Sequence, residues 1–101
     1  MFEDFEQIDN ATLRSLINSR SITIVDIRDE VSYREEHIPG AISVNEGNMS
    51  DFLKETDRNK PLVCYCYHGI SSQSAAQYFI GQAFKKVYSL TGGFEEWKNN
   101  Q

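Results

Sequence analysis

Short apolar segments alternate with helical patterns along this 101-residue chain. Four segments are rich in β-branched or aromatic residues and poor in charge, at 22–27, 41–44, 62–65 and 87–90. Such runs are typical of strands that are covered on both faces, and a shorter strand is expected at 6–8. Strands that alternate with helices pair in parallel through right-handed crossovers. The alternation therefore predicts an α/β fold with a mostly parallel sheet.

The helical patterns lie between these strands. The first follows Asp9 and Asn10, either of which could accept the hydrogen bond that caps a helix. Shorter helices are expected at 29–36 and 49–54. The clearest pattern, at 72–82, has an apolar face that contains two alanines, which would let the helix lie close to the sheet.

Length and charge limit the classes of function. The length predicts one domain over residues 1–101, and the net charge is −5 with ten basic residues scattered along the chain. Nucleic acid is therefore not an expected partner. No apolar run approaches the roughly 20 residues that span a bilayer, so no membrane association is expected. The acidic segment 1–6 does not resemble a secretion signal, and a cytoplasmic location is expected.

Cys64 and Cys66 are the two cysteines, and they are separated by a single residue. A disulfide between them would be strained, so both are expected as free thiols. With His37 and His68 as the two histidines, the chain offers no convincing metal-ligand set, and neither a metal nor another cofactor is expected. Cys64 lies inside an apolar segment and is expected to be a core side chain.

Cys66 follows the apolar segment 62–65, and a short loop with one glycine leads from it into the helix expected at 72–82. This arrangement directs backbone N–H groups and the positive end of a helix toward the sulfur. Both favour the thiolate, which is the reactive form of cysteine. The loop is therefore the predicted site of the chemistry.

A cysteine in an anion-binding loop suits either phosphoryl transfer or sulfur transfer. Phosphoryl transfer requires an arginine at the end of the loop to hold the phosphate oxygens. The corresponding residue here is Ser72, and no Arg or Lys occurs between residues 61 and 84. This absence argues against a phosphatase or an arsenate reductase and favours a cysteine that carries a persulfide.

Four segments in the same order, residues 25–29, 37–41, 66–72 and 92–97, resemble the single-domain rhodanese family of thiosulfate sulfurtransferases. The resemblance covers nearly the whole chain. It implies a rhodanese-like α/β fold with a five-stranded parallel sheet flanked by helices. It also implies that Cys66 takes the outer sulfur of thiosulfate, releases sulfite and passes the sulfur to cyanide or a thiol.

The site implied by this resemblance is Cys66 as the catalytic residue together with the substrate-binding loop residues Tyr67, His68, Gly69, Ile70, Ser71 and Ser72. Ser71 and Ser72 are expected to cap the following helix and to offer hydroxyl groups to the sulfur adduct. His68 is a candidate general base or a residue that shapes the loop. Many rhodaneses have Arg or Lys in this loop and this chain has neither, so we expect modest affinity for thiosulfate.

Arg28 is the nearest candidate cation and is expected to support the site. It could form an ion pair with Asp26, Asp29 or Glu96 that braces the loops, or it could help to bind the anion directly. Residues 37–41 are expected to form a turn into a strand, and the 92–93 glycine pair to permit a close approach beside the site.

Two functions from other classes remain open, namely a non-catalytic rhodanese-like binding or regulatory module and a thiol-redox protein that uses Cys66. For a sulfurtransferase, the expected donor is a small anion such as thiosulfate. The expected acceptor is cyanide, a small dithiol or a thioredoxin-like protein. A monomer or a weak homodimer is expected.

Overall fold

The computed structural model describes residues 5–19 and 21–100, and its strands lie where the apolar segments predict them. Each strand contains at least one β-branched or aromatic residue, which suits a pleated surface that is at least partly buried. The strands are β1 (Glu6–Ile8), β2 (Thr23–Asp26), β3 (Ile42–Ser43), β4 (Leu62–Tyr65) and β5 (Val87–Leu90).

Helices occupy the segments between the strands and after the last one. They are α1 (Asn10–Ser19), α2 (Glu30–Glu35), α3 (Met49–Glu55), α4 (Ser71–Gly81) and α5 (Gly93–Asn99). Asp9 caps α1, because its Oδ1 accepts a hydrogen bond of 2.9 Å from the Thr12 N–H. Asp29 caps α2 in the same way, through the Ser32 N–H at 2.8 Å.

The expected cap of α4 is wrong. The helix begins at Ser71, so Ser71 and Ser72 lie inside its first turn, and the N-cap residue is Ile70, which makes no side-chain capping bond. A serine caps a helix only from the position before the first helical residue. The hydroxyl of Ser72 points instead toward Cys66 and Ser89.

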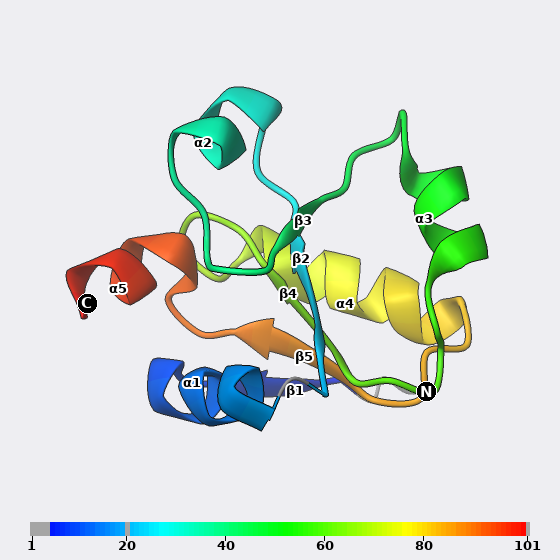
Figure 1. Ribbon diagram of the computed structural model, residues 1–101, viewed down its shortest axis with the longest axis horizontal. Helices are drawn as coiled ribbons and strands as arrows, with labels where there is room; N and C mark the ends of the chain where they lie inside the picture. Colours follow the sequence, from blue (N-terminus) through cyan, green and yellow to red (C-terminus); the bar gives the residue numbers. More distant parts are fainter. Residues whose placement is uncertain (1–4, 20, 101) are drawn as a thin grey trace.

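The five strands form one parallel sheet in the order β1-β5-β4-β2-β3. This confirms the predicted α/β class. Figure 1 shows α1 and α5 on one face of the sheet and α3 and α4 on the other. The central strand β4 is covered on both faces, and Cys66 follows it directly at its carboxyl end. Ligands of open α/β sheets bind at this edge.

Two cores lie on the two faces of the sheet, and β4 contributes to both because successive side chains of a strand point to opposite faces. Val63 and Tyr65 pack in the core under α1 and α5. Leu62 and Cys64 pack in the core under α3 and α4. Cys64 is fully buried there, which confirms that it is a core side chain.

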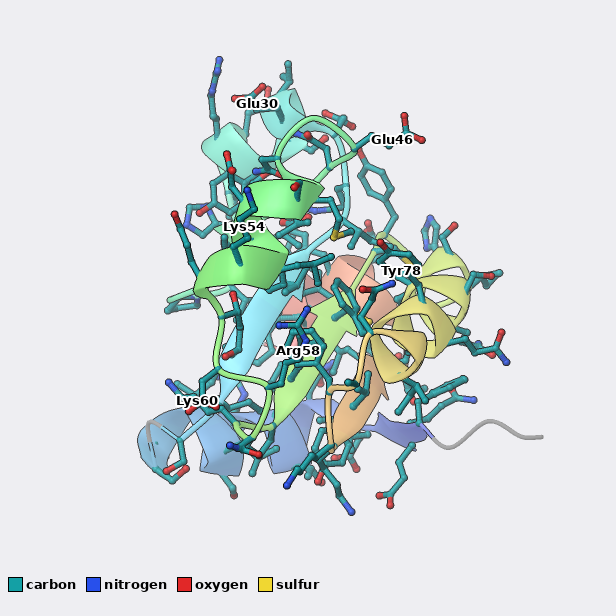
Figure 2. All side chains as sticks on the ribbon, turned by 90° about the vertical axis from the view of Figure 1, so that its right-hand side faces the viewer. Glu30, Glu46, Lys54, Arg58, Lys60 and Tyr78 are labelled. Carbon is teal, nitrogen blue, oxygen red and sulfur yellow. The ribbon has the colours of Figure 1, made fainter. Side chains whose placement is uncertain are left out.

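Arg58 joins the carboxyl ends of two helices on the α3–α4 side of the molecule (Figure 2). Its Nε donates to the carbonyl of Gln82, just after α4, at 2.6 Å, and its Nη1 donates to the carbonyl of Leu53 in α3 at 2.9 Å. A cation at these ends satisfies carbonyl groups that lack partners within the helices.

Within the described ranges, no helix has the length and apolar character needed to cross a membrane.

Candidate active site

Three loops meet at the carboxyl edge of the sheet, as the positions of their strands predict. Cys66 follows β4, Arg28 lies just after β2, and Gly93 opens α5 after β5. The guanidinium carbon of Arg28 lies 5.6 Å from the ring centre of Tyr67. The Phe94 N–H, next to Gly93, donates to the Cys66 carbonyl at 2.8 Å. Segments far apart in sequence therefore form a single site around Cys66.

The Cys66 sulfur lies in a cradle of hydrogen-bond donors. The N–H groups of Gly69 and Ser72 point at Sγ from 3.2 and 3.3 Å, and the Ser72 Oγ lies 3.5 Å away. The side chain is only 6% exposed. Burial alone raises the pKa of the Cys66 thiol, but the hydrogen bonds from Ser72, Gly69 and His68 outweigh it and lower the pKa below its ordinary value. The geometry thus favours a thiolate.

The first turn of α5 holds the other side of this loop. The Phe94 N–H binds the Cys66 carbonyl at 2.8 Å, and the Glu95 N–H binds the Tyr67 carbonyl at 3.0 Å. Free N–H groups at a helix start are strong partners for carbonyl oxygens. Because the carbonyl groups of Cys66 and Tyr67 are held toward α5, the following N–H groups of the loop are free to face the sulfur.

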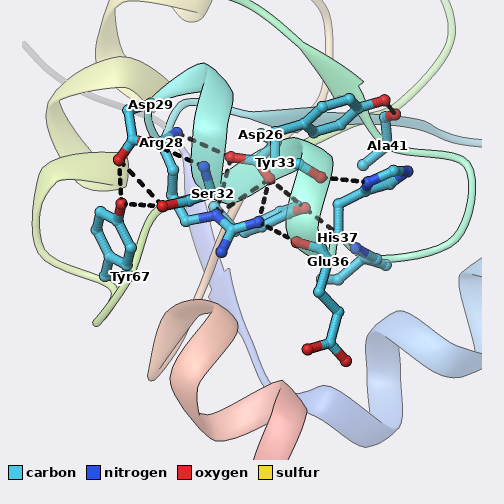
Figure 3. Close-up of polar contacts among 11 residues, drawn as sticks. Asp26, Arg28, Asp29, Ser32, Tyr33, Glu36, His37, Ala41 and Tyr67 are labelled. Atoms are coloured by element: carbon cyan, nitrogen blue, oxygen red, sulfur yellow. Dashed lines mark hydrogen bonds and ion pairs between the residues drawn. The ribbon is translucent and has the colours of Figure 1, made fainter.

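Tyr67 extends from the loop to the start of α2 (Figure 3). Its hydroxyl donates to the Asp29 carboxylate and lies 2.6 Å from the Ser32 hydroxyl. The bond from Tyr67, together with the Ser32 N–H, lowers the pKa of Asp29 to about 2. Tyr67 is 41% exposed, so it forms part of the wall beside the cradle while its tip is fixed.

Arg28 is paired with Asp26, one of the three carboxylates considered from the sequence. Its Nη2 lies 2.7 Å from Oδ2 of Asp26 and donates at 2.7 Å to the carbonyl of Glu36 (Figure 3). The guanidinium also lies 4.1 Å over the Phe94 ring. The Tyr65 hydroxyl donates to the same carboxylate at 2.6 Å. Arg28 therefore braces the loops, with its charge balanced by Asp26.

Burial raises the pKa of the Tyr65 hydroxyl, and the neighbouring Asp26 carboxylate adds to this effect. Tyr65 consequently stays protonated and can donate to Asp26 while its oxygen accepts from the Ile38 N–H at 3.2 Å. The turn at 38–41, which the Ala41 N–H closes onto the Ile38 carbonyl at 2.9 Å, is thereby attached to the central strand.

The remaining loop side chains face outward. His68, Ile70 and Ser71 are exposed, and Ile70 has 75% of its surface open to solvent. His68 contributes through its backbone N–H, which helps to lower the pKa of Cys66. Among the residues that the structure describes, no group of three His, Cys, Asp or Glu side chains is placed to hold a metal ion.

Three polar residues beside the loop were not among the predicted site residues, although Asp29 was considered as a partner of Arg28. Asp29 and Ser32 hold the tip of Tyr67, and Ser89 of β5 lies 2.8 Å from the Ser72 hydroxyl. Ser89 is fully buried. A sequence signal for it did exist, because it is the polar residue of an otherwise apolar or aromatic strand.

Two hollows lie near this edge of the sheet. One, of about 600 Å³, lies between α4 and the segment after β3 and is lined by Ile27, Val44, Asn45, Glu46, Met49, Ala75, Tyr78 and Phe79. The other, of about 220 Å³, includes Arg28, Tyr67 and Phe94 in its lining. Cys66 is not among the lining residues of either hollow.

Comparison with known proteins finds relatives that are similar over most of the chain. A thiosulfate sulfurtransferase GlpE of Coxiella burnetii is 47% identical over 94 residues, which cover 93% of this chain and 88% of that protein. The GlpE of Shewanella oneidensis is 46% identical over 93 residues, and the alignment covers 92% of each chain.

Solved structures agree on the fold. The rhodanese-like domain of an Anabaena protein matches with a TM-score of 0.83 at 24% identity, covering 96% of this chain and 76% of that chain. A rhodanese-related protein of Thermoplasma volcanium matches with a TM-score of 0.80 at 21% identity, covering 95% and 93% of the two chains. The family model of the rhodanese-like domain matches residues 9–100, and the chain therefore belongs to the rhodanese-like domain family.

Proposed function

We propose that this protein is a thiosulfate sulfurtransferase in which Cys66 carries the sulfur as a persulfide. The observation that carries the proposal is the cradle itself, in which two N–H groups point at Sγ from 3.2 and 3.3 Å in a loop with no basic side chain other than His68. The two GlpE relatives described above, at 47% and 46% identity, support thiosulfate as the donor.

The first half-reaction begins when the Cys66 thiolate attacks the outer sulfur of thiosulfate. A bond forms between this sulfur and Sγ, the sulfur–sulfur bond of thiosulfate breaks, and sulfite leaves with the bonding electron pair. The outer sulfur stays on Cys66 as an anionic persulfide. The loop N–H groups and the start of α4 stabilise this negative charge with fixed dipoles, so little reorganisation is needed.

In the second half-reaction, an acceptor nucleophile attacks the outer sulfur of the persulfide and regenerates the Cys66 thiolate. Cyanide yields thiocyanate, and a thiolate yields a new persulfide. We propose a cellular acceptor that is a small dithiol or a thioredoxin-like protein, since either supplies a thiolate. Tyr67, His68, Gly69, Ile70, Ser71 and Ser72 form the donor site in this proposal, and Arg28 supports it through its ion pair with Asp26.

We also propose the domain organisation, cellular location and oligomeric state of the protein. Residues 1–101 act as a single domain, which is supported by one continuous five-stranded sheet. A cytoplasmic location is supported by the free thiols of Cys64 and Cys66, which suit a reducing compartment. We propose a monomer or a weak homodimer, to be measured by sedimentation.

Intact-protein mass spectrometry after incubation with thiosulfate tests the function. We expect a gain of one sulfur atom that cyanide removes, that is absent in Cys66→Ser and that persists in Cys64→Ala. A folded wild-type protein that gains no sulfur would refute the proposal and favour a binding module. A mixed disulfide with added thiol in place of the sulfur adduct would favour a redox role.

A further inference from the structure

Two buried serine hydroxyls form a short chain behind Cys66. Ser72 lies in the first turn of α4 and Ser89 lies in β5, and both side chains are fully buried. Their oxygens are 2.8 Å apart, and the Ser72 Oγ is 3.5 Å from the Cys66 Sγ. The chain of contacts therefore leads from the sulfur through the helix to the neighbouring strand.

The surroundings of Ser89 are apolar. Its neighbours on the α4 face of the sheet include Val87, two residues away in β5, and Cys64, its partner in the pairing of β4 with β5. A hydroxyl in such a core is unfavourable unless it has a hydrogen-bond partner. Within residues 5–19 and 21–100, the Ser72 Oγ is the single partner of the Ser89 Oγ.

The thiolate form of Cys66 fixes the direction of the hydrogen bonds in this chain of three groups. When Cys66 is a thiol, its S–H can donate to the Ser72 oxygen, and either serine hydroxyl can donate to the other, because a hydroxyl oxygen accepts up to two hydrogen bonds. When Cys66 is a thiolate, the sulfur can only accept. Ser72 then donates to the sulfur, and because its hydroxyl has a single hydrogen, the bond between the two serines is donated by Ser89, so that each hydrogen has an acceptor.

We propose that Ser89 is a positioning residue that acts through Ser72, holding the Ser72 hydroxyl hydrogen on the Cys66 sulfur and so stabilising the thiolate. A hydroxyl that accepts one hydrogen bond is a stronger donor in the next, and this cooperation is largest in a dry interior. The importance of this effect for sulfur transfer rests on the proposed function. The ionisation of Cys66 itself does not, because it takes place whether or not sulfur is transferred.

The test is the pH dependence of Cys66 alkylation by iodoacetamide, read by intact mass. Ser89→Ala removes one hydrogen bond of modest strength, so it should raise the apparent pKa of Cys66 by roughly half a unit, equivalent to about threefold less thiolate at any pH well below that pKa. Ser72→Ala should raise it further. The matched control Ser74→Ala, an exposed serine of the same helix, should titrate like the wild type.

A double-mutant cycle separates positioning from a purely structural role. If Ser89 acts through Ser72, the double variant Ser72→Ala/Ser89→Ala titrates like Ser72→Ala alone. A Ser89→Ala protein that titrates like the wild type would overturn the proposal. The proposal would also fail if Ser89→Ala raised the apparent pKa of Cys66 by the same amount in the wild-type and in the Ser72→Ala backgrounds. If cavity formation prevents folding of Ser89→Ala, Ser89→Thr and Ser89→Val replace it.

The Ser89→Thr and Ser89→Val variants have nearly the same size and differ in the hydroxyl group. The proposal requires the lower apparent pKa in Ser89→Thr, and equal values would refute it. These outcomes are independent of sulfur transfer. If the shifts appear but thiosulfate leaves no sulfur on Cys66, the proposed function fails while the role of Ser89 stands.

Discussion

Gly93 faces the Cys66 carbonyl so closely that a β-carbon on Gly93 would lie 2.5 Å from the carbonyl oxygen. The carbonyl carbon and oxygen of Tyr67 would lie 2.6 Å from the same β-carbon. These neighbours are backbone atoms and cannot rotate away. The loop that carries the sulfur and the start of α5 are therefore packed backbone against backbone.

Gly93→Ala should displace the loop, because the added methyl group occupies the place of the Cys66 and Tyr67 carbonyls. A displacement of about 1 Å can lower a rate by as much as about a hundredfold. We therefore expect single-turnover persulfide formation to be roughly tenfold to a hundredfold slower in Gly93→Ala. Gly40→Ala is the matched control, since Gly40 also has a positive φ, +86°, but a β-carbon on Gly40 would have nothing within 4 Å. Full activity of Gly93→Ala would contradict the expectation.

Asp26→Asn should destabilise the fold strongly. It leaves the Arg28 guanidinium buried without its counter-charge, and breaking a buried ion pair costs about 3–5 kcal/mol. Urea unfolding measures the change. The control is Glu30→Gln, which breaks the exposed Arg34–Glu30 pair of 2.8 Å and should alter stability by less than about 1 kcal/mol. Similar losses in the two variants would contradict the assigned role of Arg28.

The Asp29 carboxylate, which accepts hydrogen bonds from Tyr67 and from the start of α2, should make the stability of the fold depend on pH. Its pKa is lowered to about 2 in the folded protein, below the ordinary value of about 3.9. The carboxylate therefore stabilises the fold above about pH 4, and this contribution is lost as the pH falls through about 2. The difference in urea midpoint between the wild type and Asp29→Asn should be constant from pH 7 to about 4.5 and shrink below that. A difference that does not change with pH would show that the Asp29 charge is irrelevant.

The two thiols should differ sharply in reactivity. Burial raises the pKa of the Cys64 thiol, whereas the hydrogen bonds at Cys66 outweigh its burial and lower its pKa. Iodoacetamide near neutral pH should therefore add one group to the native protein, at Cys66, and two groups after denaturation. Peptide mapping locates the group, and native-state alkylation at Cys64 would show that this core opens readily.

Inert salt should have little effect on the first half-reaction. The cradle consists of backbone N–H groups, the Arg28 charge is balanced by Asp26, and the net charge of −5 does not steer an anion from a distance. The rate of single-turnover persulfide formation should thus not fall greatly as potassium chloride is raised. A steep fall in rate would reveal a cationic side chain that binds thiosulfate.

The elements of the fold could be predicted from local patterns. The segment 62–65 is a continuous apolar run because β4 is covered on both faces, and the structure places the strand there. The order of the strands has no such local signal. It depends on packing between segments as distant as β1 and β5, which pair directly although they lie at opposite ends of the chain.

The part of the site that consists of backbone groups could be predicted from the sequence. A strand, a loop and a helix in succession are enough to place N–H groups around Cys66. The bonds of Tyr67 to Asp29 and of Ser72 to Ser89 depend on side-chain orientation across 38 and 17 residues, respectively. For the same reason the sequence left Asp26, Asp29 and Glu96 as equal candidates to pair with Arg28, and only the folded arrangement selects Asp26.

Because α5 follows the Cys66 loop in the sequence, the bonds between them can form only late in the synthesis of the chain. Cys66 is synthesised well before Phe94 and Glu95, whose N–H groups hold the carbonyls of Cys66 and Tyr67. The strand β5, which carries Ser89, also follows the cysteine. A nascent chain therefore displays its thiol before the groups that hold the loop in place exist, and the site is completed only after β5 and α5 have emerged.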